Sequence, residues 1–149
     1  MNMATSYEGR YCGVCDHPLH KGYFSLSKRS QTLTDTPSGT VVMVSADELV
    51  TDFCGSECSE YAEAAITSTL TSPYPSRGKT VPCSLCLQPV DRTLPHVSVS
   101  MMQFEDASQP WLVSARVVDE RELAVYCAAC AQPGRASQAF DESELGVAV

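Results

Sequence analysis

The chain has 149 residues and a formal net charge of −8, and Leu, Ile, Val and Phe together number 31. That share, about one-fifth, is near the lower limit for burying a self-sufficient apolar core. No apolar stretch approaches the roughly 20 residues of a membrane-spanning helix, residues 1–10 lack the apolar segment of a secretory signal, and the acidity disfavours a general nucleic-acid binder. A usage of one Asn, one Ile, three Lys and seven Arg is typical of GC-rich bacterial or phage genomes. We expect a small cytoplasmic protein whose fold needs support beyond its apolar core.

The chain up to Leu70 predicts a cysteine turn, two strands and a helix. A Cys-x2-Cys turn at 12–15 precedes an alternating segment at 22–27 and a Val-rich segment at 41–45, and both segments predict strands. A 3.6-residue pattern predicts a helix over 56–70, with Ser56 as its N-cap and Cys58 in its first turn. The expected apolar arc of this helix holds Tyr61, Ala62, Ala65, Ile66, Thr69 and Leu70, whereas Glu57, Glu60 and Glu63 fall largely outside it.

The second half follows the same order after a segment rich in Pro, Gly and Ser. Residues 72–82 are expected to form a linker. A second Cys-x2-Cys turn at 83–86 is followed by predicted strands at 97–104 and 111–118, with Trp111 expected inside the core. We therefore predict a first module at 1–71, a linker at 72–82, a second module at 83–133 and an acidic, flexible tail at 134–149.

The two modules share a detailed pattern. Residues 11–19 and 82–90 both contain Cys-x2-Cys-x2-Pro followed by an aliphatic residue. The segments between the two cysteine pairs, 16–53 in the first module and 87–126 in the second, have nearly the same length, and each ends in an aromatic residue, Phe53 or Tyr126. Each half also carries a Val-rich run and an acidic turn before that aromatic residue. These features in one order indicate a tandem repeat.

Eight cysteines form four close pairs, and they are the expected support for the fold. Two or three intervening residues let one turn aim both sulfurs at one point, and two such pairs supply the four thiolates of a closed structural zinc site. We therefore expect two Zn²⁺ ions. Their expected ligands are Cys12, Cys15, Cys54, Cys58, Cys83, Cys86, Cys127 and Cys130.

Other uses of the cysteines remain open at this point. A disulfide framework is possible for an even count, but reducing compartments keep thiols reduced and no export signal is evident. Iron competes with zinc because a tetrahedral sulfur site suits both metals. The repeat favours sequential sites, formed by the first four and the last four cysteines. The alternative is a cross-brace, in which the first and third pairs share one ion.

A cysteine turn, a β-hairpin and a cysteine pair that enters a helix together resemble the treble-clef zinc fingers. The segment from Phe53 to Tyr61 is most similar to the MYM/TRASH type, in which an aromatic-Cys-x3-Cys element opens a helix that carries another aromatic residue. Residues 83–130 resemble a generic four-cysteine zinc ribbon or treble clef. The resemblance implies a small α+β fold, with two tandem metal-stapled modules built of β-hairpins and a short helix, and a role as an interaction module.

The expected function is binding of another macromolecule rather than catalysis. Four cysteine ligands leave zinc no open position for hydrolytic chemistry, and no HExxH motif or nucleophile elbow occurs. A protein partner is expected ahead of nucleic acid, with no membrane and no small-molecule substrate. The alternatives are a transcriptional regulator that contacts nucleic acid and a CxxC thiol redox protein. The candidate partner-binding residues are Glu57, Glu60 and Glu63 on the helix and, for nucleic acid, Lys28 and Arg29.

Overall fold

The structure, a computed structural model, describes residues 9–112 and 114–131. The predicted tail at 134–149 lies outside the described residues. The elements are β1 (Gly22–Thr36), β2 (Gly39–Phe53), α1 (Ser56–Thr67), β3 (Thr80–Pro82), β4 (Pro89–Asp91), β5 (His96–Asp106) and β6 (Ala115–Tyr126).

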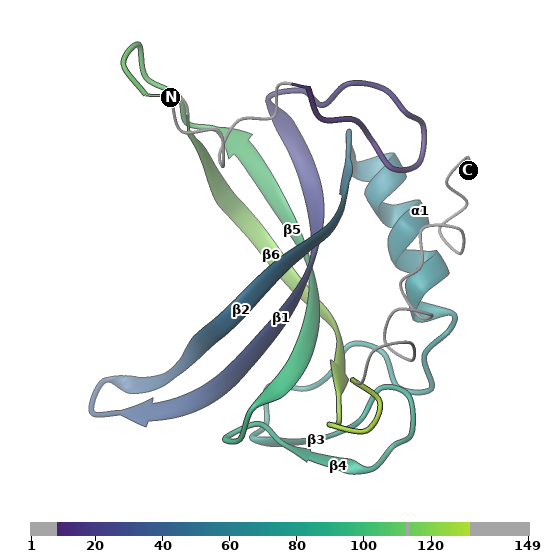
Figure 1. The fold of residues 1–149 in the computed structure, drawn as a ribbon, viewed down its shortest axis with the longest axis vertical. Helices are drawn as coiled ribbons and strands as arrows, with labels where there is room; N and C mark the ends of the chain where they lie inside the picture. The colour runs from purple at the N-terminus through teal and green to yellow at the C-terminus, as the bar shows by residue number, and fades with distance from the viewer. Residues whose placement is uncertain (1–8, 113, 132–149) are drawn as a thin grey trace.

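Two long β-hairpins join edge to edge in one antiparallel sheet of order β2-β1-β5-β6. Figure 1 shows the hairpins crossing, with their tips diverging on the left and α1 packed on the right. The short strands β3 and β4 form a second, two-stranded sheet. The coarse expectation of a small α+β fold with hairpins and one short helix is therefore confirmed. The domain boundaries stay a prediction, although the hairpins of both expected modules share one sheet.

The strands repeat the same register in both halves. β2 bulges opposite the steps Leu26/Ser27 and Ser30/Gln31 of β1, and β6 bulges opposite Val99/Ser100 and Gln103/Phe104 of β5. The offset between equivalent steps is constant, because position 27 corresponds to 100 and position 31 to 104. Ser27 also pairs directly with Ser100, so the local two-fold relation between the hairpins passes through this pair.

One face of the sheet and the helix enclose a core shared by both halves. Leu26 of β1 pairs with Met101 of β5, and both side chains are buried with Phe53, Ile66 and other apolar residues. The aromatic residues before the returning cysteine pairs, Phe53 and Tyr126, are fully buried. Burying one such side chain contributes roughly 1.5–3 kcal/mol. The two sequence repeats therefore contribute to one common core and do not form two separate cores.

The helix differs from its prediction at both ends and in which side chains it exposes. Gly55 is the N-cap, Ser56 is the first helical residue, and no side chain caps the amino end. The helix ends at Thr67, because the N–H groups of Thr69 and Leu70 bond three residues back, in the tighter geometry of a final turn. Tyr61, expected in the apolar arc, is 53% exposed.

The expectation that Glu63 lies outside the buried arc is wrong. Glu63 is only 5% exposed, and its Oε1 accepts hydrogen bonds from Tyr74 Oη at 2.9 Å and from Arg121 Nη1 at 3.1 Å. The segment after the helix and strand β6 therefore cover this side of α1.

The expectation that Trp111 lies inside the core is also wrong. Trp111 is 80% exposed in the turn between β5 and β6.

Candidate metal centres

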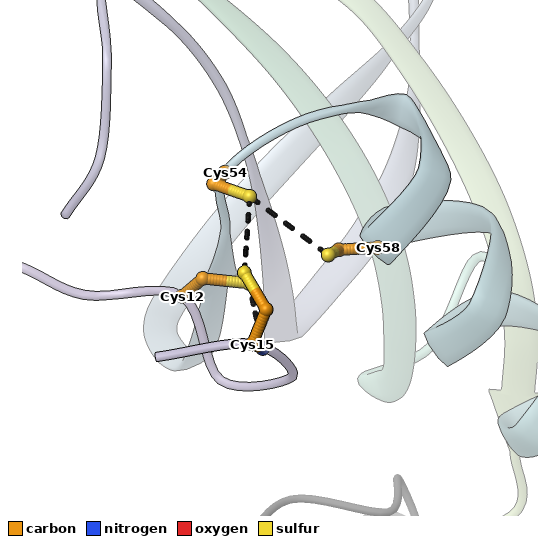
Figure 2. A group of neighbouring side chains, drawn as sticks. All are labelled: Cys12, Cys15, Cys54 and Cys58. Carbon is orange, nitrogen blue, oxygen red and sulfur yellow. Dashed lines mark hydrogen bonds between the residues drawn. The ribbon is translucent and has the colours of Figure 1, made fainter. Parts of the chain in front are cut away.

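The first site gathers four sulfurs from three places in the fold. Cys12 and Cys15 lie in a turn closed by a bridge between Tyr11 and Pro18, whereas Cys54 follows β2 and Cys58 lies in the first turn of α1. Figure 2 shows the four side chains converging. Their sulfurs all lie within 4.8 Å of one another. We call Cys12, Cys15, Cys54 and Cys58 the first site.

The second site has the same construction. Cys83 and Cys86 lie in the turn between β3 and β4, and Cys127 and Cys130 follow β6. Their sulfurs also lie within 4.8 Å of one another. We call these four residues the second site. The sequential grouping expected from the repeat is therefore confirmed, and the cross-brace is not formed.

Both cysteine turns are held by matching backbone hydrogen bonds. The N–H of Cys12 donates to the carbonyl of His17 at 2.8 Å, and the N–H of Cys83 donates to that of Gln88 at 2.7 Å. Asp16 and Leu87, each four residues after the first cysteine of its turn, adopt φ angles of 62° and 66°. Non-glycine residues rarely adopt such angles, which cost of order 1 kcal/mol or more. The same strained turn therefore occurs in both sites.

Each turn is also attached to the strand that delivers the returning cysteines. The N–H of Gly13 donates to the carbonyl of Asp52 at 2.7 Å, and the N–H of Ser84 donates to that of Val125 at 2.8 Å. Both carbonyls belong to the residue two positions before the returning cysteine. A Cβ on Gly13 would collide with the hydroxyl of Thr51, so a larger residue cannot enter unless the Thr51 side chain moves. These bonds set the distance between the two halves of each site.

The sulfur spacings fit a tetrahedral metal site rather than disulfides. Four sulfurs at about 2.3 Å from one Zn²⁺ lie about 3.8 Å apart, whereas a disulfide needs about 2.05 Å. The Sγ atoms of Cys15 and Cys54 are 3.4 Å apart, and those of Cys54 and Cys58 are 3.8 Å apart. In the second site, Cys86 and Cys127 are separated by 3.6 Å. All eight cysteines are free, so two groups able to hold a metal ion are present.

One thiol in each site has a pKa below the usual value for cysteine. Burial would raise the pKa of Cys12, but backbone N–H groups, chiefly those of Cys15 and Val14, lower it to about 7. The pKa of Cys83 is lowered to about 7 in the same way, by the N–H groups of Cys86 and Cys127 against the effect of burial. Each site therefore offers one thiolate near neutral pH without help from a cation.

Three other thiols, those of Cys54, Cys58 and Cys130, resist ionisation when no cation is near. Burial, and then the hydrogen bond to Cys15, raises the pKa of Cys54 to about 11. Burial likewise raises the pKa of Cys58, and burial with the bond to Cys127 raises that of Cys130 to about 12. Four negative charges cannot share so small a space unless a divalent cation neutralises them. This donor set therefore fits a soft divalent metal that binds thiolates.

The two sites differ in how well they are covered. Cys15 is exposed, and Cys54 and Cys58 are half-buried, whereas Cys83 and Cys130 are 0% and 1% exposed. The imidazole Nδ1 of His17 lies 3.0 Å from Cys15 Sγ. The corresponding residue of the second turn is Gln88. Cys86 and Cys127 of the second site are half-buried, so the first site differs in having an exposed cysteine and an imidazole neighbour.

An ion pair that sequence reasoning missed supports the first site. Arg10 Nε donates to Asp52 at 2.9 Å. Arg10 lies two positions before Cys12 and Asp52 lies two positions before Cys54, so this ion pair links the two halves of the site. Ser25 Oγ also donates to Asp52, at 2.6 Å. Proximity in sequence to the cysteines is the only available signal, because 42 residues separate Arg10 from Asp52.

The second half contains a comparable group. Arg92 is 5% exposed and donates to Glu122 at 2.9 Å, and Ser98 Oγ donates to the same carboxylate. Ser98 occupies the β5 position that corresponds to Ser25 in β1, by the same offset that relates the two pairs of bulges. Both groups lie on the face of the sheet opposite the core. One joins Arg10, which precedes β1, to Asp52 of β2, and the other joins Arg92, which precedes β5, to Glu122 of β6.

The candidate partner-binding residues do not form one surface. Glu57 and Glu60 are exposed on α1, but Glu63 is buried. Lys28 and Arg29 are half-buried in β1. Arg29 donates to Asp47 at 3.3 Å and to Glu120 at 2.8 Å, so neighbouring carboxylates already balance its charge.

No protein family, curated protein or solved structure that was compared with the chain matches it. Among residues 9–112 and 114–131, no helix is long and apolar enough to cross a membrane.

Proposed function

We propose that the chain is a zinc protein whose two four-cysteine sites are structural, and that it acts as a protein-interaction or regulatory module. The observation that carries this proposal is the pair of clusters, each with four sulfurs within 4.8 Å. Zinc bound by four thiolates is fully coordinated and has no position for a reactive water. The function is therefore expected to reside on the surface that the metals stabilise, as in the treble-clef fingers that the cysteine pattern resembles.

Zinc is preferred to iron as the default ion of such sites, and a reducing cytoplasmic environment suits eight free thiols. Elemental analysis of the purified protein should give about two zinc ions per chain. Fewer than about 1.5 metal ions, together with disulfides detected by mass spectrometry, would reject the zinc assignment. Iron in place of zinc would keep the structural role but change the metal.

A protein partner is favoured over nucleic acid by the charge balance. Two Zn²⁺ ions held by eight thiolates take the formal charge from −8 to about −12. Arg29, one of the two basic residues in the candidate patch, is paired with Asp47 and Glu120. A basic protein segment is thus a better electrostatic match than a phosphate backbone.

The exposed acidic side of α1 provides the test of this preference. Replacing Glu57 and Glu60 by Lys, with the buried Glu63 left intact, should weaken binding of a partner captured from host-cell extract by about tenfold, mainly through slower association. The zinc content should stay at two ions per chain. Titration of the captured protein against both the original chain and this variant measures the effect.

Asp119→Lys is the control for this experiment, because Asp119 is an exposed acidic residue of β6 rather than of α1. It should leave partner binding unchanged. A mixed oligonucleotide pool supplies the opposing measurement. Micromolar oligonucleotide affinity at physiological salt, lost on Lys28→Glu, would instead favour the nucleic-acid alternative.

A further inference from the structure

Strand β2 presents an open and strongly apolar edge. Among the described residues, β2 pairs with β1 alone, and from Gly39 to Leu49 the backbone groups on its other side have no partner there and face solvent. Every residue from Gly39 to Leu49 is exposed. Four consecutive apolar residues lie in this stretch, with exposed fractions of 39% for Val41, 50% for Val42, 57% for Met43 and 44% for Val44.

These side chains are exposed on both faces of the strand. Successive residues of a strand point to opposite faces, so Val42 and Val44 lie on one side and Met43 on the other. β1 pairs with β5 only as far as Gln31, and the hairpin continues beyond that point as a two-stranded ribbon (Figure 1). Two-stranded ribbons are marginally stable in water, and this one is apolar on both faces. It gains stability from any further strand that covers it.

The equivalent strand of the second half shows how the same fold protects an edge. β6 is the other edge strand of the sheet, and Val117 of β6 corresponds to Val44 of β2. Charges on an edge strand prevent pairing with another chain. The part of β6 that corresponds to Gly39–Ala46 carries Arg116 and Asp119, whereas β2 has no charged residue there, although its Asp47 and Glu48 match Glu120 and Arg121 further along. The protection is therefore absent from the stretch of β2 between Gly39 and Ala46.

We propose that β2 pairs with β2 of a second copy of this chain, antiparallel and about a two-fold axis near Met43. In that register Val42 lies opposite Val44 of the second copy, and Met43 lies opposite Met43. Asp47 lies opposite Gly39, so no two like charges meet along the ribbon. The pairing satisfies the open backbone groups and buries the apolar residues of both ribbons.

The size of the contact sets the expected strength of this dimer. Eight residues from Gly39 to Ala46 extend about 27 Å, and a contact of one strand edge on each side falls below about 1,200 Å² in total. We therefore expect a micromolar dimer in exchange with monomer. Each zinc-loaded chain carries a net charge of about −12, and salt screens the repulsion between two copies, so the dimer should tighten as salt is added.

Sedimentation of the zinc-loaded full chain from about 5 to about 500 µM should show a concentration-dependent monomer–dimer equilibrium. Val44→Lys should raise the dissociation constant at least about tenfold, because the ammonium group would enter the apolar contact. Val117→Lys adds the same charge at the equivalent position of β6 and should leave the dimer intact. Adding Lys lowers the overall repulsion in both variants, so a dimer lost only in Val44→Lys reports the local contact.

Other results overturn the inference. A monomer at every concentration, larger assemblies in place of a dimer, or equal effects of the two variants would each exclude β2-to-β2 pairing. Met43→Glu, with a carboxylate at the proposed axis, is a second variant in case Val44→Lys does not fold. Zinc content is measured alongside, because the inference rests on the proposed structural role of the metals. A monomer with two zinc ions rejects the dimer alone, whereas a chain without metal rejects the proposed function.

Discussion

Replacing Cys83 by Ser should remove one metal ion and most of the folding stability of the protein. Cys83 is completely buried and belongs to the same apolar cluster as Tyr126. Structural zinc contributes roughly 10–16 kcal/mol in small finger domains, more than the roughly 5–15 kcal/mol by which native proteins are usually stable. We expect about one zinc ion per chain and no cooperative thermal unfolding transition above room temperature, measured by elemental analysis and circular dichroism.

The reason lies in the attachment of the second cysteine turn to β6. The N–H of Ser84 donates to the carbonyl of Val125, and the N–H of Val125 donates in return to Ser84 Oγ at 3.0 Å. Releasing this turn uncovers the end of β6, where Leu123, Val125 and Tyr126 are fully buried. The damage should therefore spread into the common core.

Cys15→Ser is the matched comparison, since it also removes one thiolate. Cys15 is exposed, and it lies outside the apolar cluster. This variant should lose the first metal but keep a cooperative transition, with the second site loaded. Equal loss of structure in both variants would show that the first metal supports the core as much as the second.

The local pattern of the cysteines is sufficient to predict both sites and their sequential grouping. Two- and three-residue spacings fix which sulfurs share a turn, and the aromatic residue before each returning pair marks the buried end of a strand. Phe53 and Tyr126 are indeed fully buried. The hairpins are predicted as well, although the strand bounds differ. β2 extends from Gly39 to Phe53, well beyond the predicted 41–45, and β6 begins at Ala115, four residues after the start of the segment predicted at 111–118.

What could not be predicted depends on contacts between the halves. The repeat gives no indication that β1 and β5 pair, because each hairpin satisfies its own pattern alone. Glu63 looks like a surface residue on the helix, yet Arg121 and Tyr74 reach it from elsewhere in the chain. The salt bridge between Arg92 and Glu122 likewise joins residues 30 positions apart. Charge complementarity over such distances leaves no periodic signal.

The two sites should release zinc at different rates when a chelator is added. Attack on a zinc thiolate site begins at an accessible sulfur. Cys15 of the first site is exposed, whereas in the second site Cys83 and Cys130 are buried and Cys86 and Cys127 are half-buried. A metal indicator should record two phases of about one equivalent each, with rates that differ by about tenfold or more, which corresponds to about 1.4 kcal/mol in activation free energy.

Trapping the thiols identifies the site that empties first. Maleimide added after the fast phase, followed by peptide mass spectrometry, should label the cysteines of the first site and leave Cys83 and Cys130 unmodified. Early labelling of Cys83, or a single phase of two equivalents, would contradict the expected order.

A substitution of His17 tests this order of zinc release. Its Nδ1 lies 3.0 Å from Cys15 Sγ, and an imidazole N–H that donates to a thiolate stabilises the charged ligand. His17→Gln makes the first turn match the second, where Gln88 occupies the equivalent position. The variant should bind its first metal about tenfold more weakly and should accelerate only the fast phase. Acceleration of the slow phase would mean that the two sites are coupled through the shared sheet, so that loss of one metal loosens the other.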